Sequence, residues 1–425
     1  MAESDSELIP LDRLRIGHYI ELDLGWLAHP FPTNAFKITT QRQLQTVKGL
    51  GLHQVRIVPS KSDPAADPVP EAKSPVAAGQ SQARSDSADA DKARARQQLL
   101  SRQRQSLAEC ERLFGDAMRA YRQALAHVED QPETARTQCE AVVASHVVTM
   151  LEGGESAIRL LSDNMGDRGA LHPVNVSVLS LLLGRQLGLA QDELHTLGLA
   201  AMLHDLGKAA LPERLRWPEE NFTGPEMRAY QEHVQHGVRL GKRMGLSEPV
   251  LQAIAQHHEL MDGSGFPARL SGQALTPLAR IVGLINRYDE FCNPSRPALA
   301  VTPHEALAVL YAQYRTRYDA AMLQVFIRMM GVYPPGSVVQ LTDGRYALVE
   351  SVNSARPLKP CVTVYDPAVA PDQALLLNLE HDSKLGIARS LKPLALPRAA
   401  LDYLSPRKRI CYFFERALST SEVPL

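Results

Sequence analysis

His204-Asp205-Leu206-Gly207-Lys208 directly follows the apolar run Leu197-Gly198-Leu199-Ala200-Ala201-Met202-Leu203. The run is typical of a buried helix, and a histidine next to an aspartate at its end delivers two metal-ligand side chains together. If the helix continues, Lys208 lies about one turn beyond Asp205, where its ammonium can neutralise a phosphate. The stretch therefore predicts a metal site on a helical core.

Four more histidines flank this stretch in the same region of the chain, namely His172, His233, His257 and His258. Histidine and carboxylate ligands suit iron, manganese and zinc, and no cysteine lies in the cluster. Two such ions about 3.5–4 Å apart could share Asp205 as a bridging carboxylate and hold a hydroxide between them. Because a hydroxide of this kind attacks phosphorus, the cluster favours a hydrolase that acts on phosphate esters.

These residues also have purely structural interpretations. His204 alone on an apolar helix would more often be a core histidine whose hydrogen bonds are satisfied. The pair His257-His258 could end a helix and interact favourably with its dipole. Asp205 and Lys208 beside His204, and the glycine-rich loop Asp262–Pro267 after the histidine pair, favour metal ligation.

The sequence around the cluster predicts helices and no convincing strand. Apolar residues recur at helical spacing in five segments, which are residues 174–187, 190–203, 226–244, 249–259 and 277–291. We therefore expect a multidomain, mainly helical protein in which residues 166–330 form an all-helical catalytic domain.

The remaining segments differ in composition. Residues 1–59 predict a small α+β domain, with a helix over 41–50 between short strands over 14–22 and 54–58. Residues 60–95 are rich in Ser, Ala, Pro, Asp and Lys and predict a disordered linker. Residues 96–165 predict a helical stalk that leads into the catalytic domain. Residues 331–425 predict a small β unit, because residues 336–349 alternate around the turn Asp343-Gly344.

Composition limits the possible partners and the compartment. The chain has 46 Lys plus Arg and 47 Asp plus Glu, so its net charge of -1 predicts no general affinity for DNA or anionic membranes. No run of about 18 apolar residues predicts a membrane span, and residues 1–5 lack the features of a signal peptide. The five cysteines never form a CxxC pair. We therefore expect reduced thiols and a cytoplasmic protein.

Three motifs together resemble the HD-GYP subgroup of the HD-domain metal phosphohydrolases, a bacterial family. They are His204-Asp205-Leu206-Gly207-Lys208, His233 with Gly237, and His257-His258-Glu259-Leu260-Met261-Asp262-Gly263-Ser264-Gly265-Phe266-Pro267. The last is similar to the signature HHExxDGxGYP, with Phe266 in place of tyrosine. Residues 25–31 resemble a small domain that often precedes HD-GYP domains.

The resemblance implies a signalling phosphodiesterase that hydrolyses cyclic di-GMP to the linear dinucleotide, to GMP or to both, with two divalent ions, iron or manganese. The metal ligands that it implies by position are His172, His204, Asp205, His233, His257 and His258. Lys208 corresponds to the phosphate-facing lysine, and Asp289 and Arg296 lie where the family contacts substrate. The GYP-type loop comprises Asp262, Gly263, Gly265, Phe266 and Pro267, and diguanylate cyclase domains are its expected partners. A homodimer is a further possibility.

Two positions depart from the family pattern. Asn286 stands where the family has a ligand aspartate, and its amide oxygen is a neutral, weaker ligand. Arg168 stands where members with a third metal have a glutamate, which favours two ions over three. Two hypotheses follow: a working cyclic dinucleotide phosphodiesterase, or a catalytically weak module that binds a nucleotide or a partner protein. Asn286 favours the second, and the otherwise complete ligand set favours the first.

Overall fold

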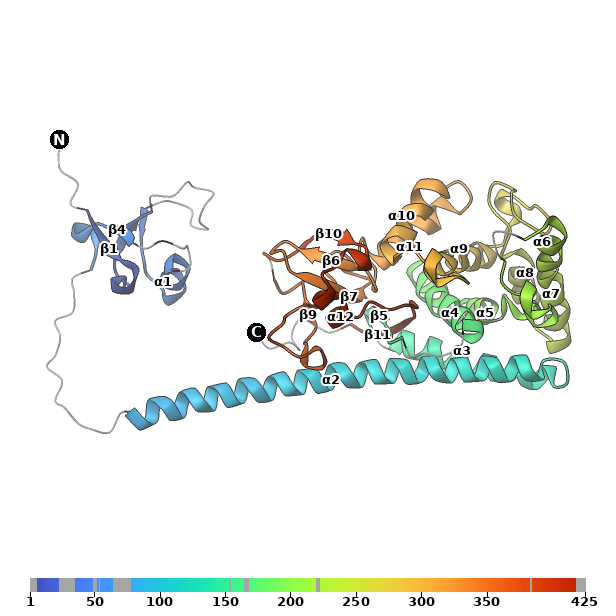
Figure 1. The fold of residues 1–425 in the computed structure, drawn as a ribbon, viewed down its shortest axis with the longest axis horizontal. Coiled ribbons are helices and arrows are strands. Elements are labelled where there is room, and N and C mark those ends of the chain that lie inside the picture. The colour runs from blue at the N-terminus through green and yellow to red at the C-terminus, as the bar shows by residue number, and fades with distance from the viewer. Residues whose placement is uncertain are drawn as a thin grey trace. The chain divides into compact units, whose positions relative to one another are not determined.

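The computed structural model describes residues 6–22, 35–48, 52, 54–63, 78–152, 154–163, 168–218, 222–382 and 384–417 (Figure 1). The chain divides into two compact units, Met1–Ser85 and Asp86–Leu425. The segment 25–31, which carries part of the family resemblance, lies outside the described residues. Within the described ranges, no helix is long and apolar enough to cross a membrane.

The N-terminal unit is a small antiparallel sheet with one helix. Its strands run in the order β1-β4-β2-β3, with bounds β1 Glu7–Pro10, β2 Tyr19–Glu21, β3 Ala35–Lys37 and β4 Gln54–Ile57. Helix α1, Gln41–Lys48, follows β3. Ile20, Ile38, Val47 and Val55 are buried in a separate small core, because the apolar residues of the strands and of α1 turn toward one another. The α+β prediction is confirmed.

A long helix, α2, begins at Ala78 and ends at His127, and its residues from Asp86 onward belong to the second unit. The predicted linker over 60–95 therefore includes residues that are helical, and residues 64–77 lie outside the described part. The physical reason is composition: residues 80–95 contain no proline or glycine, and their most frequent residue is alanine, the strongest helix former. Downstream, Phe114, Met118 and Tyr121 are buried in the main core, so this half of α2 packs on the domain.

Nine helices lie between residues 132 and 330 of the described chain; the eight after α3 fall in the range 166–330, which is helical as predicted. Their bounds are α3 Pro132–Glu152, α4 Arg168–Gln186, α5 Gln191–Leu203, α6 Gly224–Gln231, α7 His233–Met244, α8 Glu248–Gln256, α9 Pro277–Cys292, α10 Pro303–Gln313 and α11 Ala320–Met330. The single helix predicted over 226–244 is wrong, because α6 and α7 are separated at Glu232. The backbone of Glu232 keeps helical angles (φ -62°, ψ -19°). The spacing of the apolar residues therefore continues across the break and does not reveal it.

The second unit also contains a seven-stranded antiparallel sheet. Its main order is β10-β6-β7-β5-β11; β8 also pairs with β7, and β9 pairs with β8. The bounds are β5 Ser156–Leu160, β6 Val338–Leu341, β7 Tyr346–Asn353, β8 Cys361–Val364, β9 Leu377–Asn378, β10 Ile387–Leu391 and β11 Tyr412–Arg416. A short helix, α12 Arg398–Leu404, precedes β11.

Strand β5 corrects the purely helical prediction for residues 96–165. All five of its residues are buried, so it has no polar face and none of the alternation that marks a half-buried strand. Tyr412 pairs with Leu160, and Ile158 pairs with both Phe414 and Val352. The C-terminal strands are therefore built around a strand that precedes the catalytic helices, and the sheet shares its core with them.

The core contains a titratable group, His146 of α3, which is 2% exposed. Its ring lies edge-on to Phe413 at 5.1 Å and to Phe414 at 5.9 Å between ring centres. Burial lowers the pKa of His146 from 6.5 to about 4. Below pH 6.5 the unfolded chain therefore binds a proton at this residue, whereas the folded protein binds it only below about pH 4. The free energy of unfolding therefore decreases as the pH is lowered from 6.5 to about 4.

We expect His146→Leu to flatten the pH dependence of stability. Between pH 7.5 and pH 5, the wild-type protein should lose about 2 kcal/mol more free energy of unfolding than the variant, because only the wild type carries this proton linkage. Urea unfolding of both proteins at the two pH values measures the difference. Equal losses in the two proteins would contradict the assignment.

Candidate metal centre

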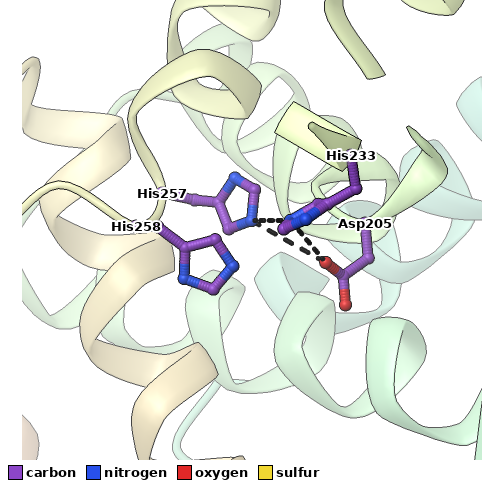
Figure 2. Close-up of side chains that lie close together, drawn as sticks. All are labelled: Asp205, His233, His257 and His258. Carbon is purple, nitrogen blue, oxygen red and sulfur yellow. Dashed lines mark hydrogen bonds and ion pairs between the residues drawn. The ribbon is translucent and has the colours of Figure 1, made fainter. Parts of the chain in front are cut away.

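The carboxylate of Asp205 lies between two pairs of histidines. His204 directly follows α5, and Asp205 starts the 3-10 turn Leu206–Ala210. Oδ2 of Asp205 is 3.5 Å from Nε2 of His172 and 3.4 Å from Nε2 of His204. Oδ1 is 3.6 Å from Nε2 of His233 and 3.7 Å from Nε2 of His257 (Figure 2). Each oxygen of one carboxylate therefore faces its own pair of imidazoles.

Two sets of side chains lie close enough to hold a metal ion, and Asp205 belongs to both. One set is Asp205, His233, His257 and His258, whose ligand atoms lie within 4.8 Å of one another, and the other is His172, His204 and Asp205. Figure 2 shows the first set converging from the ends of different helices. The structure thus brings together six of the seven predicted metal ligands.

Backbone carbonyls fix the orientation of three of the imidazoles. Nδ1 donates to the carbonyl three residues earlier in His204 (Ala201, 2.7 Å), His233 (Tyr230, 2.6 Å) and His257 (Ile254, 2.7 Å). A neutral imidazole that donates through Nδ1 carries a lone pair on Nε2. The Nε2 atoms of His233 and His257 are only 3.4 Å apart, so two lone pairs face the same small space, as they do around a cation.

His172 is oriented by a carboxylate instead. Its Nδ1 is 2.5 Å from Oδ2 of Asp289, whose other oxygen accepts hydrogen bonds from Asn175 and from Asn293. Asp289 is 1% exposed. The resemblance implies that Asp289 contacts substrate, and this placement differs: the side chain is enclosed and orients a histidine, as a carboxylate behind a metal ligand does.

Three polar atoms in this region are buried without a hydrogen-bond partner in the described part of the chain. They are Nε2 of His204, Oδ1 of Asp205 and Oδ1 of Asn286. Asn286 is 3% exposed and precedes Asp289 by three residues on α9, which puts both on one helix face. Leaving such atoms unpaired costs about 1–3 kcal/mol each, and a divalent cation would satisfy them. The donor set, imidazole with carboxylate and amide oxygen, therefore fits such an ion.

The electrostatics keep the side chains in their ligand forms. Burial lowers the pKa of His233 to about 3, so its imidazole is neutral. Burial alone would raise the pKa of Asp205, but Lys208 and then His204 outweigh this effect and hold it well below the usual value. A neutral His233 imidazole and an ionised Asp205 carboxylate are in the protonation states that metal binding requires.

Lys208 contacts Asp205 directly and is bordered by two aromatic rings. Its Nζ is 2.6 Å from Oδ2 of Asp205, 4.6 Å from the ring centre of Trp217 and 5.5 Å from that of Tyr230. The ring of Tyr230 also lies 4.7 Å from that of His233. Sequence reasoning missed both aromatic residues. The only signal for Trp217 is that one of the chain's two tryptophans lies nine residues after Lys208.

The predicted GYP-type loop packs on the histidines. The ring of Phe266 stacks on His258 at 4.5 Å, with 23° between the ring planes. Both oxygens of Glu259 accept backbone hydrogen bonds beyond the loop, from Ala268 at 2.6 Å and Leu270 at 2.9 Å. Asp262 caps the turn by accepting from the Ser264 amide at 2.9 Å. Three further loop residues complete the predicted set: Gly263 with φ +77°, Gly265 and Pro267, which follows a cis peptide bond.

The positions of two arginines from the sequence analysis, Arg296 and Arg168, are less informative about the site. Arg296 is exposed and precedes the 3-10 turn Pro297–Leu299, after the end of α9. Arg168 is the first residue of α4, and its side chain lies outside the described part. Neither observation tests the role that the family resemblance implies for these residues.

Comparison with known proteins identifies the domain. Residues 139–322 match the family model described as HD domain, and residues 6–139 match a domain of unknown function (DUF3391). Residues 139–322 are therefore similar to HD domains. The second match places a recognised family ahead of this domain, as the resemblance implies.

Two similar proteins are cyclic di-GMP phosphodiesterases. PA4108 of Pseudomonas aeruginosa is 28% identical over 365 residues, which cover 84% of each chain. The response regulator RpfG of Xanthomonas campestris pv. campestris is 33% identical over 149 residues, which cover 35% of this chain and 39% of RpfG. The resemblance of the chain to HD-GYP phosphodiesterases is confirmed, and so is its mainly helical multidomain fold.

Two further matches complete the comparison. The 3'3'-cGAMP-specific phosphodiesterase 3 of Vibrio cholerae is 25% identical over 164 residues, or 38% of this chain and 35% of that protein. Among solved structures, Bd1817, an HDG"Y"P protein from Bdellovibrio bacteriovorus, matches with 16% identity and a TM-score of 0.42, covering 75% of this chain and 97% of Bd1817.

We expect Gly207→Ala to disrupt the HD domain near the centre. A β-carbon at Gly207 would lie 1.9 Å from the carbonyl oxygen of His233 and 2.3 Å from the amide nitrogen of Gly237. Both contacts are backbone, so the 3-10 turn and α7 must separate, and the free energy of unfolding should fall by about 3 kcal/mol or more. Urea unfolding measures this loss.

Gly115→Ala is the matched control, because a β-carbon there meets only Nη1 of Arg119, at 3.5 Å. Gly115 lies inside α2, where alanine stabilises a helix by about 1 kcal/mol over glycine. Similar stabilities for the two variants would show that the close approach of Gly207 to α7 is not required.

Proposed function

We propose that this chain is a metal-dependent phosphodiesterase that hydrolyses cyclic di-GMP to the linear dinucleotide, to GMP or to both. The observation that carries the proposal is the position of the Asp205 carboxylate. Each of its two oxygens faces a separate pair of imidazoles. The names of PA4108 and RpfG support the substrate. A signalling role follows from that substrate.

The proposed centre holds two divalent ions, iron or manganese. His172, His204 and Asp205 would hold one ion, and Asp205, His233, His257 and His258 would hold the other. Asn286 is the proposed amide ligand, which is consistent with its buried, unpartnered oxygen. Such ions, when bound, lower the pKa of a coordinated water and polarise the phosphoryl oxygens.

The chain's own residues orient the ligands and balance charge. Asp289 fixes the His172 ring through Nδ1, and carbonyls fix three other rings. Lys208, 2.6 Å from Asp205, places an ammonium beside the proposed ions, where it stabilises the charge that develops on the phosphate. Trp217 and Tyr230 flank this ammonium and offer aromatic faces to a base of the substrate. Arg296 and the described loop after His258 are the proposed contacts to substrate and to a diguanylate cyclase domain.

A second function, binding without turnover, rests on Asn286. A neutral amide contributes no charge to offset that of the ions, so metal affinity is lower than with a carboxylate at this position. Under this alternative, the chain binds a nucleotide or a partner protein as a signalling module.

We expect Lys208→Met to lower kcat for cyclic di-GMP by about 100-fold, because an oriented charge at the phosphate is lost. Chromatography of products after incubation with Mn²⁺ or Fe²⁺ measures kcat, with 3'3'-cGAMP assayed in parallel. Lys392→Met is the control. Lys392 is exposed and forms an ion pair with Glu305, and neither residue belongs to the candidate metal centre. This variant should therefore leave kcat unchanged. Intact cyclic di-GMP with every metal, alongside measurable binding, would leave the binding module as the function.

We expect Asn286→Asp to raise the metal content of the purified protein. A buried carboxylate adds a negative charge beside the proposed ions and strengthens their binding. Metal analysis per chain, at limiting free Mn²⁺, measures the change. Asn378→Asp in β9 is the control, because Asn378 accepts a hydrogen bond from the Glu380 amide through Oδ1, which a carboxylate also does. An equal metal content in wild type and Asn286→Asp would argue against Asn286 as a ligand.

A further inference from the structure

A cavity lies between α2 and the seven-stranded sheet, away from the candidate metal centre. It has a volume of about 970 Å³ and is lined by α2 on one side and by β5, β7, β8, β9 and β11 on the other. In Figure 1, α2 runs along this part of the sheet. The contact is held by Ser106, which donates to Glu415, and by the amide of Leu376, which donates to Gln103 at 3.2 Å. The volume suits a small organic molecule.

A buried arginine lines this cavity with its donors largely unused. Arg159 of β5 is 6% exposed, and its Nε has no hydrogen-bond partner in the described part of the chain. Its ion pair with Glu415 spans 3.7 Å, which is beyond hydrogen-bond distance. Glu415 accepts instead from Ser106 and, at 3.2 Å, from Ser351. The guanidinium therefore has Glu415 as a nearby charge partner but no hydrogen-bond acceptor among the described residues, and a buried donor without an acceptor is unfavourable.

The charges around the cavity favour an anion. Arg102 and Arg416 line it and are exposed, and neither has a carboxylate partner among the described residues. Lys359 donates to two backbone carbonyls, those of Asp382 at 3.3 Å and Leu385 at 3.1 Å. The other acidic residue in the lining, Glu380, is already paired with Arg356. Positive charge therefore exceeds what the lining itself neutralises.

Part of the lining is aliphatic. Leu99 of α2 faces the run Leu375–Leu377 across the cavity, and the described lining residues include no Phe, Tyr or Trp. A nucleotide base would find no aromatic side chain of these kinds to stack on, whereas a hydrocarbon chain gains from contact with leucines. The neutral thiol of Cys361, whose pKa burial raises to about 12, adds no charge.

We propose that this cavity binds an aliphatic carboxylate, with its carboxylate at Arg159 and its hydrocarbon chain along the four leucines. A carboxylate accepts two hydrogen bonds from a guanidinium in one plane. The site shares no residue with the metal centre, so it is a second ligand site beyond the proposed hydrolysis and can be tested by binding alone.

Isothermal titration of the full chain with dodecanoate tests the proposal. We expect one saturable site per chain, with dodecanol, inorganic phosphate and GMP each binding about tenfold or more weakly. Dodecanol lacks the charge, phosphate lacks the chain, and GMP carries an aromatic base. Equal affinity for dodecanol and dodecanoate, tighter binding of GMP, or no saturable binding of dodecanoate would each overturn the proposal.

Variants locate the site. Arg159→Met alone would leave Glu415 as an unpaired partly buried charge, so it is combined with Glu415→Gln. The double variant should bind dodecanoate about tenfold or more weakly. Leu376→Trp should abolish binding by filling the cavity, and it decides the question if the double variant does not fold. Arg345→Met, at an exposed arginine paired with Asp343, should bind as the wild type. Unchanged affinity in Leu376→Trp would overturn the proposal.

Discussion

The carboxylate of Asp205 is the point at which the helices of the candidate metal centre meet. It is 4% exposed and has four imidazole nitrogens within 3.7 Å, and these come from α4, the end of α5, the start of α7 and the end of α8. Neutral imidazoles and one anion attract only weakly in the absence of a cation. The helices that carry them must therefore be held in place by packing elsewhere, with Gly207 permitting the closest approach.

Part of that support comes from the sheet at the C-terminus. Asn175 and Asn293 both donate to Asp289, and both also donate to the carbonyl of Ile410, just before β11. The amide of Tyr412, in β11, donates to Asn175 at 2.8 Å. β11 in turn pairs with β5. His172 is thus oriented through Asp289 by residues of α4 and α9 that are bonded to the segment 410–412, so the C-terminal β segment is part of the support of the centre.

The sequence allowed the chemistry to be predicted better than its surroundings. Candidate ligands such as His204 and Asp205 lie in short motifs whose residue types and spacing are local, so no long-range information is needed to propose them. Strand β5 was missed because burial on both faces removes its periodicity, and the start of α2 was missed because charged alanine-rich sequence suits helix and linker alike. The position of Asp289 under His172, and of Trp217 beside Lys208, depends on tertiary packing that no local pattern records.

Asn286 raises a question of charge, which Asp289 helps to answer. An amide in place of a carboxylate removes one negative charge from the ligands themselves, but Asp289 lies one turn further along α9 and contacts His172 at 2.5 Å. A carboxylate bonded to the far nitrogen of a ligating imidazole raises the basicity of that ligand. The Asp289 charge therefore acts on the proposed centre through one intervening ring, and its effect is weaker than that of direct ligation. Lys208 acts in the opposite sense, because its ammonium neutralises part of the charge of Asp205. A substrate phosphate brings negative charge of its own. It would therefore strengthen metal binding more in a centre with Asn286 than in one with an aspartate at this position.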